Sequence, residues 1–299
     1  MVLRSTAAAL AETLRAPLLL SPVADVASGW VLVTALTEQP VSDAQRTTVL
    51  VAAACACSLL AAGMAQNAWL DLGDDRARKP ERPLPRGALS VAAVRTTWAL
   101  LSLTAAGLAL WRGELLPVVL GILALTAAYH LLLKRWRLAG CLALGGLRSG
   151  SMALGALAAG GAAHPEILAL GCGTYGLYIL GASWHAAGDD QPGARGASRA
   201  GIGLCQATLV ALAAGAWWPG LAGVSWHAAA ASLLAAFAIY RLVMSARLHP
   251  PPRITGVALS GLHLFHAALA TALGRPLVAA MVLVLFGASR RLLRIFPPS

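Results

Sequence analysis

The feature that most constrains this chain is a succession of apolar runs. Each run has about the 20 residues that a helix needs to cross a bilayer. Pro, Gly or charged residues separate them, as at Pro219-Gly220. This pattern predicts an all-α, polytopic transmembrane bundle of nine to ten helices, which forms one integral-membrane domain over residues 1–299. The predicted spans lie near residues 16–37, 47–70, 92–111, 114–133, 139–160, 165–187, 200–218, 225–246, 254–272 and 276–293.

The composition agrees with a membrane protein. Charged residues make up only 12% of the chain and hydrophobic residues 58%, whereas soluble proteins carry about 25% charged residues. The net charge of +11 could suggest nucleic acid. However, the basic residues fall between apolar runs and no nucleic-acid-binding motif is visible, so we expect a lipid bilayer as the partner and no nucleic acid. No secretory cleavage site follows the N-terminus, so we expect the first span to be retained.

The basic residues predict the orientation. If the N-terminus is cytoplasmic, Arg15, the segment 76–86, Lys134 and Arg135 all lie inside. The other side then receives only Arg46, Arg112 and Arg275. We therefore predict a bacterial plasma-membrane protein with its N-terminus and its active site on the cytoplasmic side.

One polar stretch follows the second span. Asn67, Asp71 and Asp75 are spaced at i, i+4 and i+8, which places three oxygen-bearing side chains on one face of a helix. Such ligands suit Mg²⁺, which takes one or two carboxylates and leaves positions for water or phosphate. Pro80, Pro83 and Pro85 prevent the helix from continuing. The spacing predicts a magnesium-bound diphosphate at the membrane surface, and a solvated helix end whose acids pair with nearby arginines is the alternative.

Basic residues follow the acids directly, and they could take up the charge of a phosphate group. They are Arg76, Arg78, Lys79, Arg82 and Arg86.

The pattern Asn-x3-Asp-x3-Asp followed by Lys-Pro-Glu-Arg-Pro-Leu-Pro-Arg-Gly resembles the first aspartate-rich motif of the UbiA-type intramembrane prenyltransferases. The chain departs from that motif at Ala68, where most of the family carries an aspartate. The resemblance extends from about residue 14 to about residue 272, and it makes the span 276–293 an addition to the family's nine helices. It implies an isoprenyl diphosphate as substrate, Mg²⁺ as cofactor, and Asp71 and Asp75 as metal ligands beside Asn67. Arg82 and Arg86 would bind the diphosphate.

Two further clusters resemble family features. Tyr129 and Lys134 stand where the family has a tyrosine four residues before a lysine, although His130 occupies the tyrosine position here. The resemblance implies that Lys134 binds the diphosphate and that the ring of Tyr129 stabilises the allylic cation. The alternative is an interfacial tyrosine and a lysine that reaches to the membrane surface. Arg148 is the single charge in its predicted span, so we expect it to face a polar cavity, a diphosphate or a motif aspartate. The glycine-rich segment around Arg148 is also similar to a bacterial UbiA-like subgroup linked to cyclitol-type metabolite clusters.

A second aspartate motif is expected after the sixth span. The acids there, Asp189 and Asp190, are adjacent rather than four residues apart, so the second metal site is incomplete. The resemblance implies that Asp189 or Asp190 supports a second ion. If Asp189 matches the family's second acid, His185 stands in for the first; if Asp190 matches it, Ala186 stands there instead. The alternative is a capped helix end followed by a glycine-rich loop. Arg195 and Arg199 follow and could contact phosphate.

The sequence thus predicts a Mg²⁺-dependent prenyltransferase that joins an isoprenyl group to a small acceptor, with Lys134, Arg148 and Tyr129 as catalytic residues. A non-catalytic isoprenoid-binding or carrier protein on the same scaffold is one alternative. A transporter is another, but the sequence places its acids at one face of the membrane rather than within it.

Overall fold

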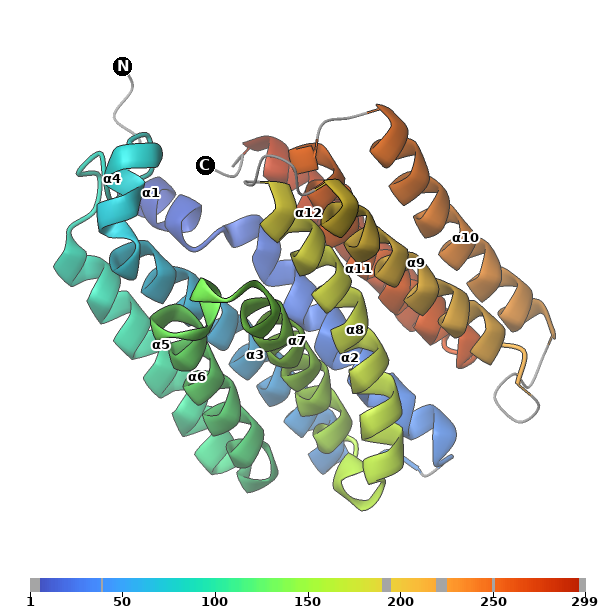
Figure 1. Cartoon of the computed structure of the whole chain (residues 1–299). Coiled ribbons are helices and arrows are strands. Elements are labelled where there is room, and N and C mark those ends of the chain that lie inside the picture. The colour runs from blue at the N-terminus through green and yellow to red at the C-terminus, as the bar shows by residue number, and fades with distance from the viewer. Residues whose placement is uncertain (1–5, 39, 190–194, 219–224, 249–250, 296–299) are drawn as a thin grey trace.

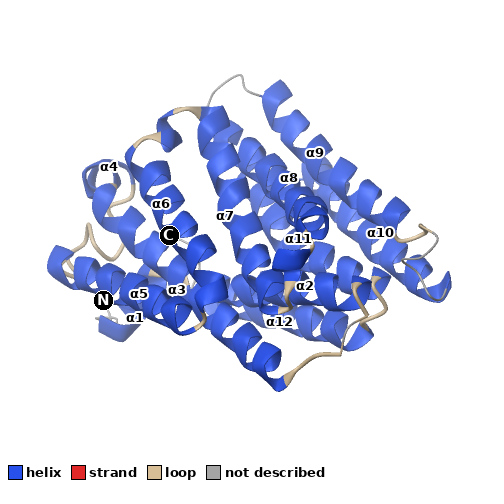
Figure 2. Ribbon diagram, turned by 90° about the horizontal axis from the view of Figure 1, so that it is seen from below, coloured by secondary structure: helices blue, strands red, loops and turns tan. Residues whose placement is uncertain are grey.

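The computed structural model describes residues 6–38, 40–189, 195–218, 225–248 and 251–295. All regular secondary structure within these ranges is helical (Figure 2). The α-helices are α1 (Thr6–Thr13), α2 (Leu20–Leu36), α3 (Asp43–Leu70), α4 (Leu72–Arg78), α5 (Val91–Trp111), α6 (Leu116–Leu131), α7 (Arg137–Ala158), α8 (Pro165–Asp189), α9 (Arg195–Gly215), α10 (Ser225–Leu248), α11 (Pro251–Ala272) and α12 (Pro276–Ile295). Short 3₁₀ helices are η1 (Ala16–Leu19), η2 (Gly113–Leu115), η3 (Leu133–Arg135) and η4 (Gly161–Ala163).

The ten long helices in the described ranges coincide with the ten predicted apolar runs. Among the residues that the structure describes, eight segments are long and apolar enough to cross a membrane, and a shorter apolar stretch, Arg199–Gly215, lies within α9. The remaining long helix, α12, carries Arg290 and Arg291 near its end. The predicted all-α transmembrane bundle is confirmed.

Local sequence signals set where several helices begin. Ser42 caps α3 in a reciprocal arrangement with Gln45, and the Ser90 hydroxyl accepts from the backbone N–H of Ala93 at the start of α5. The helices α8, α11 and α12 each begin with a proline, whose fixed φ suits a first helical position and whose missing N–H costs nothing there. The helix boundaries therefore follow the predicted breaks closely.

The bundle has two sides joined by a central group of helices. Figure 1 shows α3, α5 and α6 together on one side and α9 and α10 on the other. The central helices α2, α7 and α8 lie between them, where α7 packs against both α2 and α8. The helix α4 and the start of α2 lie at the same end of the bundle as the end of α12.

Two glycines bring α2 and α7 into backbone contact. A Cβ atom at Gly29 would lie 1.9 Å from the Met152 carbonyl oxygen, and one at Gly155 would lie 1.9 Å from that of Val26. Small residues allow such approach within membranes, where packing rather than water exclusion drives helix association. Gly29 and Gly155 therefore allow the two backbones to touch.

This contact predicts the effect of adding one methyl group. We expect Gly155→Ala to lower the melting temperature in detergent by about 3–10 °C, because the new Cβ forces the two backbones apart. Gly173→Ala is the matched control, since a Cβ there meets no atom within 4 Å. Thermal unfolding followed by size-exclusion chromatography measures both variants. Equal melting temperatures for the two would contradict the close contact.

Candidate active site

The first motif spans a break between two helices. The helix α3 ends at Leu70, and Asp71 leaves helical geometry with ψ near 8° before α4 begins. Backbone hydrogen bonds still join Asp71 to Asn67 and Asp75 to Asp71, at 2.9 and 2.8 Å. The three motif residues therefore keep their spacing of one turn, but not on the single continuous helix that the sequence predicted. The break lets the two aspartates turn toward different partners.

Asp75 faces the loop that follows α4. That loop, residues 79–90, consists of turns, as its prolines predicted, and Gly87 adopts a left-handed φ of 76°. The loop returns Arg82 to Asp75, where the guanidinium Nη1 donates to both carboxylate oxygens at 2.9 and 2.8 Å. Both side chains are largely buried, with 14% and 10% exposed. Low exposure strengthens this ion pair relative to a surface pair.

Asp71 pairs with a cation from a distant part of the sequence. Its carboxylate accepts from the Lys134 ammonium group in η3, which follows α6. Tyr129, near the end of α6, lies with its ring against that of His130, with centroids 4.9 Å apart. The structure thus brings the predicted Lys134 to the first motif.

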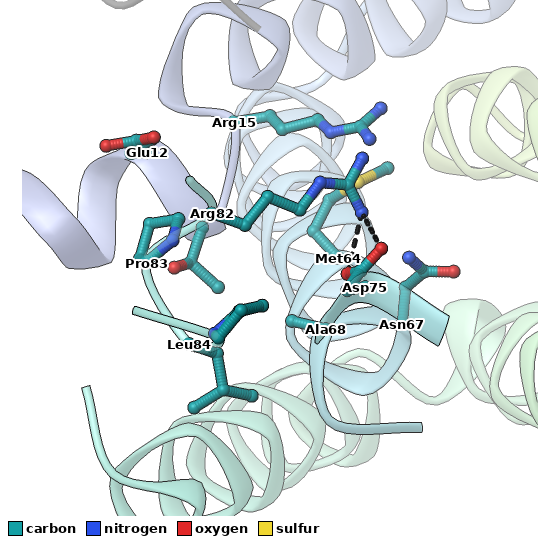
Figure 3. Close-up of a pocket in the computed structure, with 11 residues that line it drawn as sticks. Glu12, Arg15, Met64, Asn67, Ala68, Asp75, Arg82, Pro83 and Leu84 are labelled. Carbon is teal, nitrogen blue, oxygen red and sulfur yellow. Dashed lines mark hydrogen bonds and ion pairs between the residues drawn. The ribbon is translucent and has the colours of Figure 1, made fainter. Parts of the chain in front are cut away.

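A pocket opens between the N-terminal segment, the end of α3 and the loop after α4 (Figure 3). Asn67, Asp75 and Arg82 line it, as predicted, and the space measures about 410 Å³ including its open mouth. Figure 3 shows Arg15 and Arg82 extending in the same direction across the pocket. Glu12, Thr13, Met64, Ala68, Pro83, Leu84 and Pro85 complete the lining.

Arg15 was not among the residues that the sequence assigned to the site. It sits at a left-handed turn between α1 and η1, with φ of 49°. Burial and the neighbouring Arg82 guanidinium lower the pKa of Arg15, while Asp75 and Tyr129 act in the opposite direction. Arg15 and Arg82 therefore share the pocket with two carboxylates, Asp75 and Glu12. Because Glu12 also pairs with Arg86, three arginines face two acids, an arrangement that favours an anionic ligand. Only the fold brings Arg15 near residues 67–82.

Arg86 forms an ion pair with Glu12 rather than with a motif aspartate. Its Nη2 atom donates to the Glu12 carboxylate at 3.1 Å, and its Nη1 atom to the Glu81 carbonyl at 2.9 Å. The side chain of Glu12 is only 6% exposed. Arg86 thereby fastens α1 over the loop that carries Arg82.

The second predicted motif falls at the edge of the described residues. Asp189 is the last residue of α8; its side chain, that of Arg195 and the whole of Asp190 lie outside the described part. His185 is buried in α8, and Arg199 is exposed on α9. No cluster of three or more His, Cys, Asp or Glu side chains that could hold a metal occurs in the described ranges.

Arg137 lies beside the C-terminal end of α8, where the second motif was expected. Arg137, at the start of α7, donates to the Trp184 carbonyl at 2.6 Å and lies over the Trp184 ring at 4.5 Å. It binds the last turns of α8, where a positive charge complements the helix dipole.

Arg148 lies in a buried polar cluster within the bundle. Its Nη2 atom donates to Asp25 Oδ1 at 2.8 Å. The Tyr175 hydroxyl donates to the same oxygen at 2.7 Å, and His266 Nε2 lies 2.9 Å from it. Asp25, Tyr175 and His266 are fully buried. Arg148 thus contacts Asp25, not the motif aspartates that the sequence offered as its partner.

This cluster corrects one expectation from the sequence. The acids were expected at one face of the membrane, but Asp25 lies within the candidate span Ala16–Leu36. Its partners come from the middle of α7, from α8 and from α11. The absence of an intramembrane acid was therefore a wrong argument against a transporter. A buried carboxylate that is paired with an arginine is nevertheless a means of joining helices.

Comparison with known proteins identifies the family of this chain. The UbiA prenyltransferase family matches residues 26–269, so the chain belongs to this family. The predicted membership is confirmed, and the chain is a UbiA-family prenyltransferase with the intramembrane scaffold of that family.

Two solved structures share the fold. One is described as "Structural and mechanistic insights into the biosynthesis of Digeranylgeranylglyceryl phosphate synthase in membranes"; it is 15% identical, with a TM-score of 0.62, and the match covers 90% of this chain and 99% of that one. The other is the apo structure of a UbiA homologue from Aeropyrum pernix K1. It is 20% identical, with a TM-score of 0.61, and the match covers 91% and 98% of the two chains. No curated protein matches the chain.

We expect the stability losses caused by mutations in the buried cluster to be non-additive. Arg148→Met leaves Asp25 as an uncompensated buried charge, and breaking such a pair costs about 3–5 kcal/mol. We expect the double variant Asp25→Asn, Arg148→Met to melt at a higher temperature than Arg148→Met alone. Thermal unfolding of both single variants and of the double variant in detergent measures the coupling. Simple addition of the two single losses would contradict the pairing.

Proposed function

We propose that this protein transfers an isoprenyl group from an isoprenyl diphosphate to a small acceptor in a Mg²⁺-dependent reaction. One observation carries the proposal. Three cations from separate parts of the sequence, Arg15, Arg82 and Lys134, meet the carboxylates of Asp71 and Asp75 at one end of an apolar bundle. Family membership supports the reaction class.

The donor set of the first motif fits Mg²⁺ chemically. Asp71, Asp75 and the Asn67 amide offer two carboxylates and a neutral oxygen within two turns, and Mg²⁺ commonly takes one or two carboxylates together with substrate phosphate. Both carboxylates contact flexible cationic side chains that phosphate oxygens can also attract. When bound, the ion would neutralise charge on the diphosphate as it leaves.

The basic residues would stabilise the leaving group. The bond between C1 of the isoprenyl chain and the diphosphate oxygen breaks, and its electron pair stays with the diphosphate. Arg15, Arg82 and Lys134 would take up that growing negative charge, which is mainly an electrostatic task in a site with little water. The acceptor then forms a bond to C1 and releases a proton. Tyr129, near Arg15, could shield the positive carbon with its π-face.

An apolar pocket in the membrane region could receive the isoprenyl chain. It measures about 500 Å³ and lies between α3, α5 and α6, about one turn deeper than Asn67 on α3. Leu59, Ala62, Leu123 and Trp98 give it a mostly apolar surface, and Gln66, Ser102 and Thr126 also line it. A hydrocarbon chain suits such a surface, because the polar end of the ligand would remain with the charged residues.

The metal motif gives the first test. We expect Asp71→Asn and Asp75→Asn each to reduce Mg²⁺-dependent diphosphate release about 100-fold or more, because each removes a carboxylate that would hold Mg²⁺ against the diphosphate. Geranyl, farnesyl and geranylgeranyl diphosphates are supplied to purified protein with a membrane extract as acceptor source, and mass spectrometry identifies the product. Asp74→Asn is the matched control, because Asp74 lies exposed between the two acids. Full activity in both motif variants would refute the proposal. Diphosphate binding without release by the wild type would favour a carrier instead.

Arg15 gives the second test. We expect Arg15→Gln to weaken binding of an isoprenyl diphosphate about tenfold, through loss of one charge-assisted contact. Arg76→Gln is the control, because Arg76 is exposed on α4 and does not line the pocket. Isothermal titration with farnesyl diphosphate in detergent gives both affinities. Equal weakening in the two variants would mean that Arg15 acts only through overall charge.

A further inference from the structure

The C-terminal third of the chain has an unbalanced charge. Residues 191–299 contain nine arginines and no acidic residue. A partner of opposite charge must therefore come from elsewhere in the fold or from outside the protein. Two of these arginines, Arg241 and Arg290, approach each other in the structure, and no ion pair between described residues involves either one.

The two guanidinium groups share one aromatic ring. The Arg241 guanidinium lies 5.3 Å from the Phe286 ring centroid, and that of Arg290 lies 5.6 Å from it. Arg241 belongs to α10, whereas Phe286 and Arg290 belong to α12, and both helices pack against α11. Like charges this close repel each other, so an anion between them would stabilise the arrangement.

Arg241 is held in place with one donor unused. Its Nη2 atom donates to the Ser260 hydroxyl of α11 at 3.1 Å, and that hydroxyl donates to the Val257 carbonyl. The Nη1 atom is buried and makes no hydrogen bond within the described residues. A buried charged donor without a partner is costly, which indicates a missing acceptor.

The pair lies near enough to one end of the bundle for its side chains to reach the phosphate level of a membrane. Arg241 lies seven residues before the end of α10 and Arg290 five before the end of α12, roughly 10 and 8 Å along the helices. Both ends lie at the same side of the bundle as the first motif. Arginines at this depth reach toward lipid headgroups.

On the faces of α10 and α12 that carry Arg241 and Arg290, apolar side chains follow toward the membrane centre. Phe237, four residues before Arg241, is 50% exposed. Phe286 and Leu283 lie four and seven residues before Arg290, on its face of α12, and Leu283 is 37% exposed. A ligand that follows both faces needs an anionic head and hydrocarbon chains.

We propose that Arg241 and Arg290, with Ser260 orienting Arg241, form a binding site for the phosphate group of an anionic phospholipid. The phosphate accepts from the exposed Arg290 guanidinium and, once the Arg241 side chain turns its buried Nη1 atom outward, from that atom as well. The acyl chains lie along Phe237 and Leu283. Basic sites between helices at the membrane surface commonly bind anionic headgroups. This site is separate from the proposed reaction and does not depend on it.

The experiment compares lipids with and without net charge. Purified protein in detergent is titrated with dioleoylphosphatidylglycerol or dioleoylphosphatidylcholine, and native mass spectrometry measures the bound fraction while thermal unfolding measures stabilisation. We expect the wild type to prefer phosphatidylglycerol, and Arg241→Gln to weaken that lipid's binding about tenfold or more. Arg290→Gln should weaken it in the same direction. Arg241→Lys, which keeps the charge, should retain the preference for phosphatidylglycerol and thereby separate loss of the site from misfolding.

Control variants and a third ligand make the result decisive. Arg291→Gln removes an exposed charge beside Arg290, and Arg275→Gln removes one near the start of α12; we expect both to bind phosphatidylglycerol as the wild type does. Equal binding of the two lipids, or unchanged binding by Arg241→Gln, would overturn the proposal. Stabilisation by inorganic phosphate at matched ionic strength, equal to that by phosphatidylglycerol, would also overturn it, because the ligand would then be a free anion.

Discussion

The need to balance charge inside a membrane shapes the centre of this protein. Asp25, Arg148, Tyr175 and His266 come from four helices and meet at a single carboxylate oxygen. An ionised group in the bilayer core is tolerated only with a partner. The contacts of Asp25 with Arg148, Tyr175 and His266 therefore fix the position of α2 against α7, α8 and α11. The glycine contact between α2 and α7 adds a steric constraint beside it. Since α2 continues directly from η1 and Arg15, the same constraint fixes one wall of the candidate site.

In the candidate site, unlike the buried cluster, the ion pairs can change partners. Its acids and bases lie at the end of the bundle and pair through the long side chains of Arg82 and Lys134. The Lys134–Asp71 pair is partly exposed, and the Arg82–Asp75 pair is largely buried but lines the open pocket. Such pairs can exchange partners when a strongly charged ligand enters the pocket, whereas Asp25 is completely buried and cannot give up Arg148 without leaving a charge uncompensated. One bundle thus holds a rigid ionic cluster in its interior and an exchangeable set of charges at its surface.

The second half of the bundle differs in composition from the first. Lys134 lies at the first motif, but the second predicted motif has adjacent acids, and Arg137 stacks on Trp184 in the neighbouring last turns of α8. Beyond this point the chain carries arginines without acids. The fold is nevertheless that of the family, with TM-scores of 0.62 and 0.61 to two solved relatives at 15% and 20% identity. The fold is therefore kept although most residues differ between the chains.

The sequence by itself determined the helices, because apolar runs of membrane length and their proline and glycine breaks are local properties. It also determined the first motif and its family, since Asn67, Asp71, Asp75 and the following loop are contiguous. It assigned Arg148 a polar partner but could not name Asp25, which lies 123 residues away. Only the tertiary structure brought Arg15 to Arg82, Lys134 to Asp71 and Arg241 to Arg290. The physical reason is that pairing between side chains on different helices depends on how the helices rotate and cross, and neither is encoded in local periodicity.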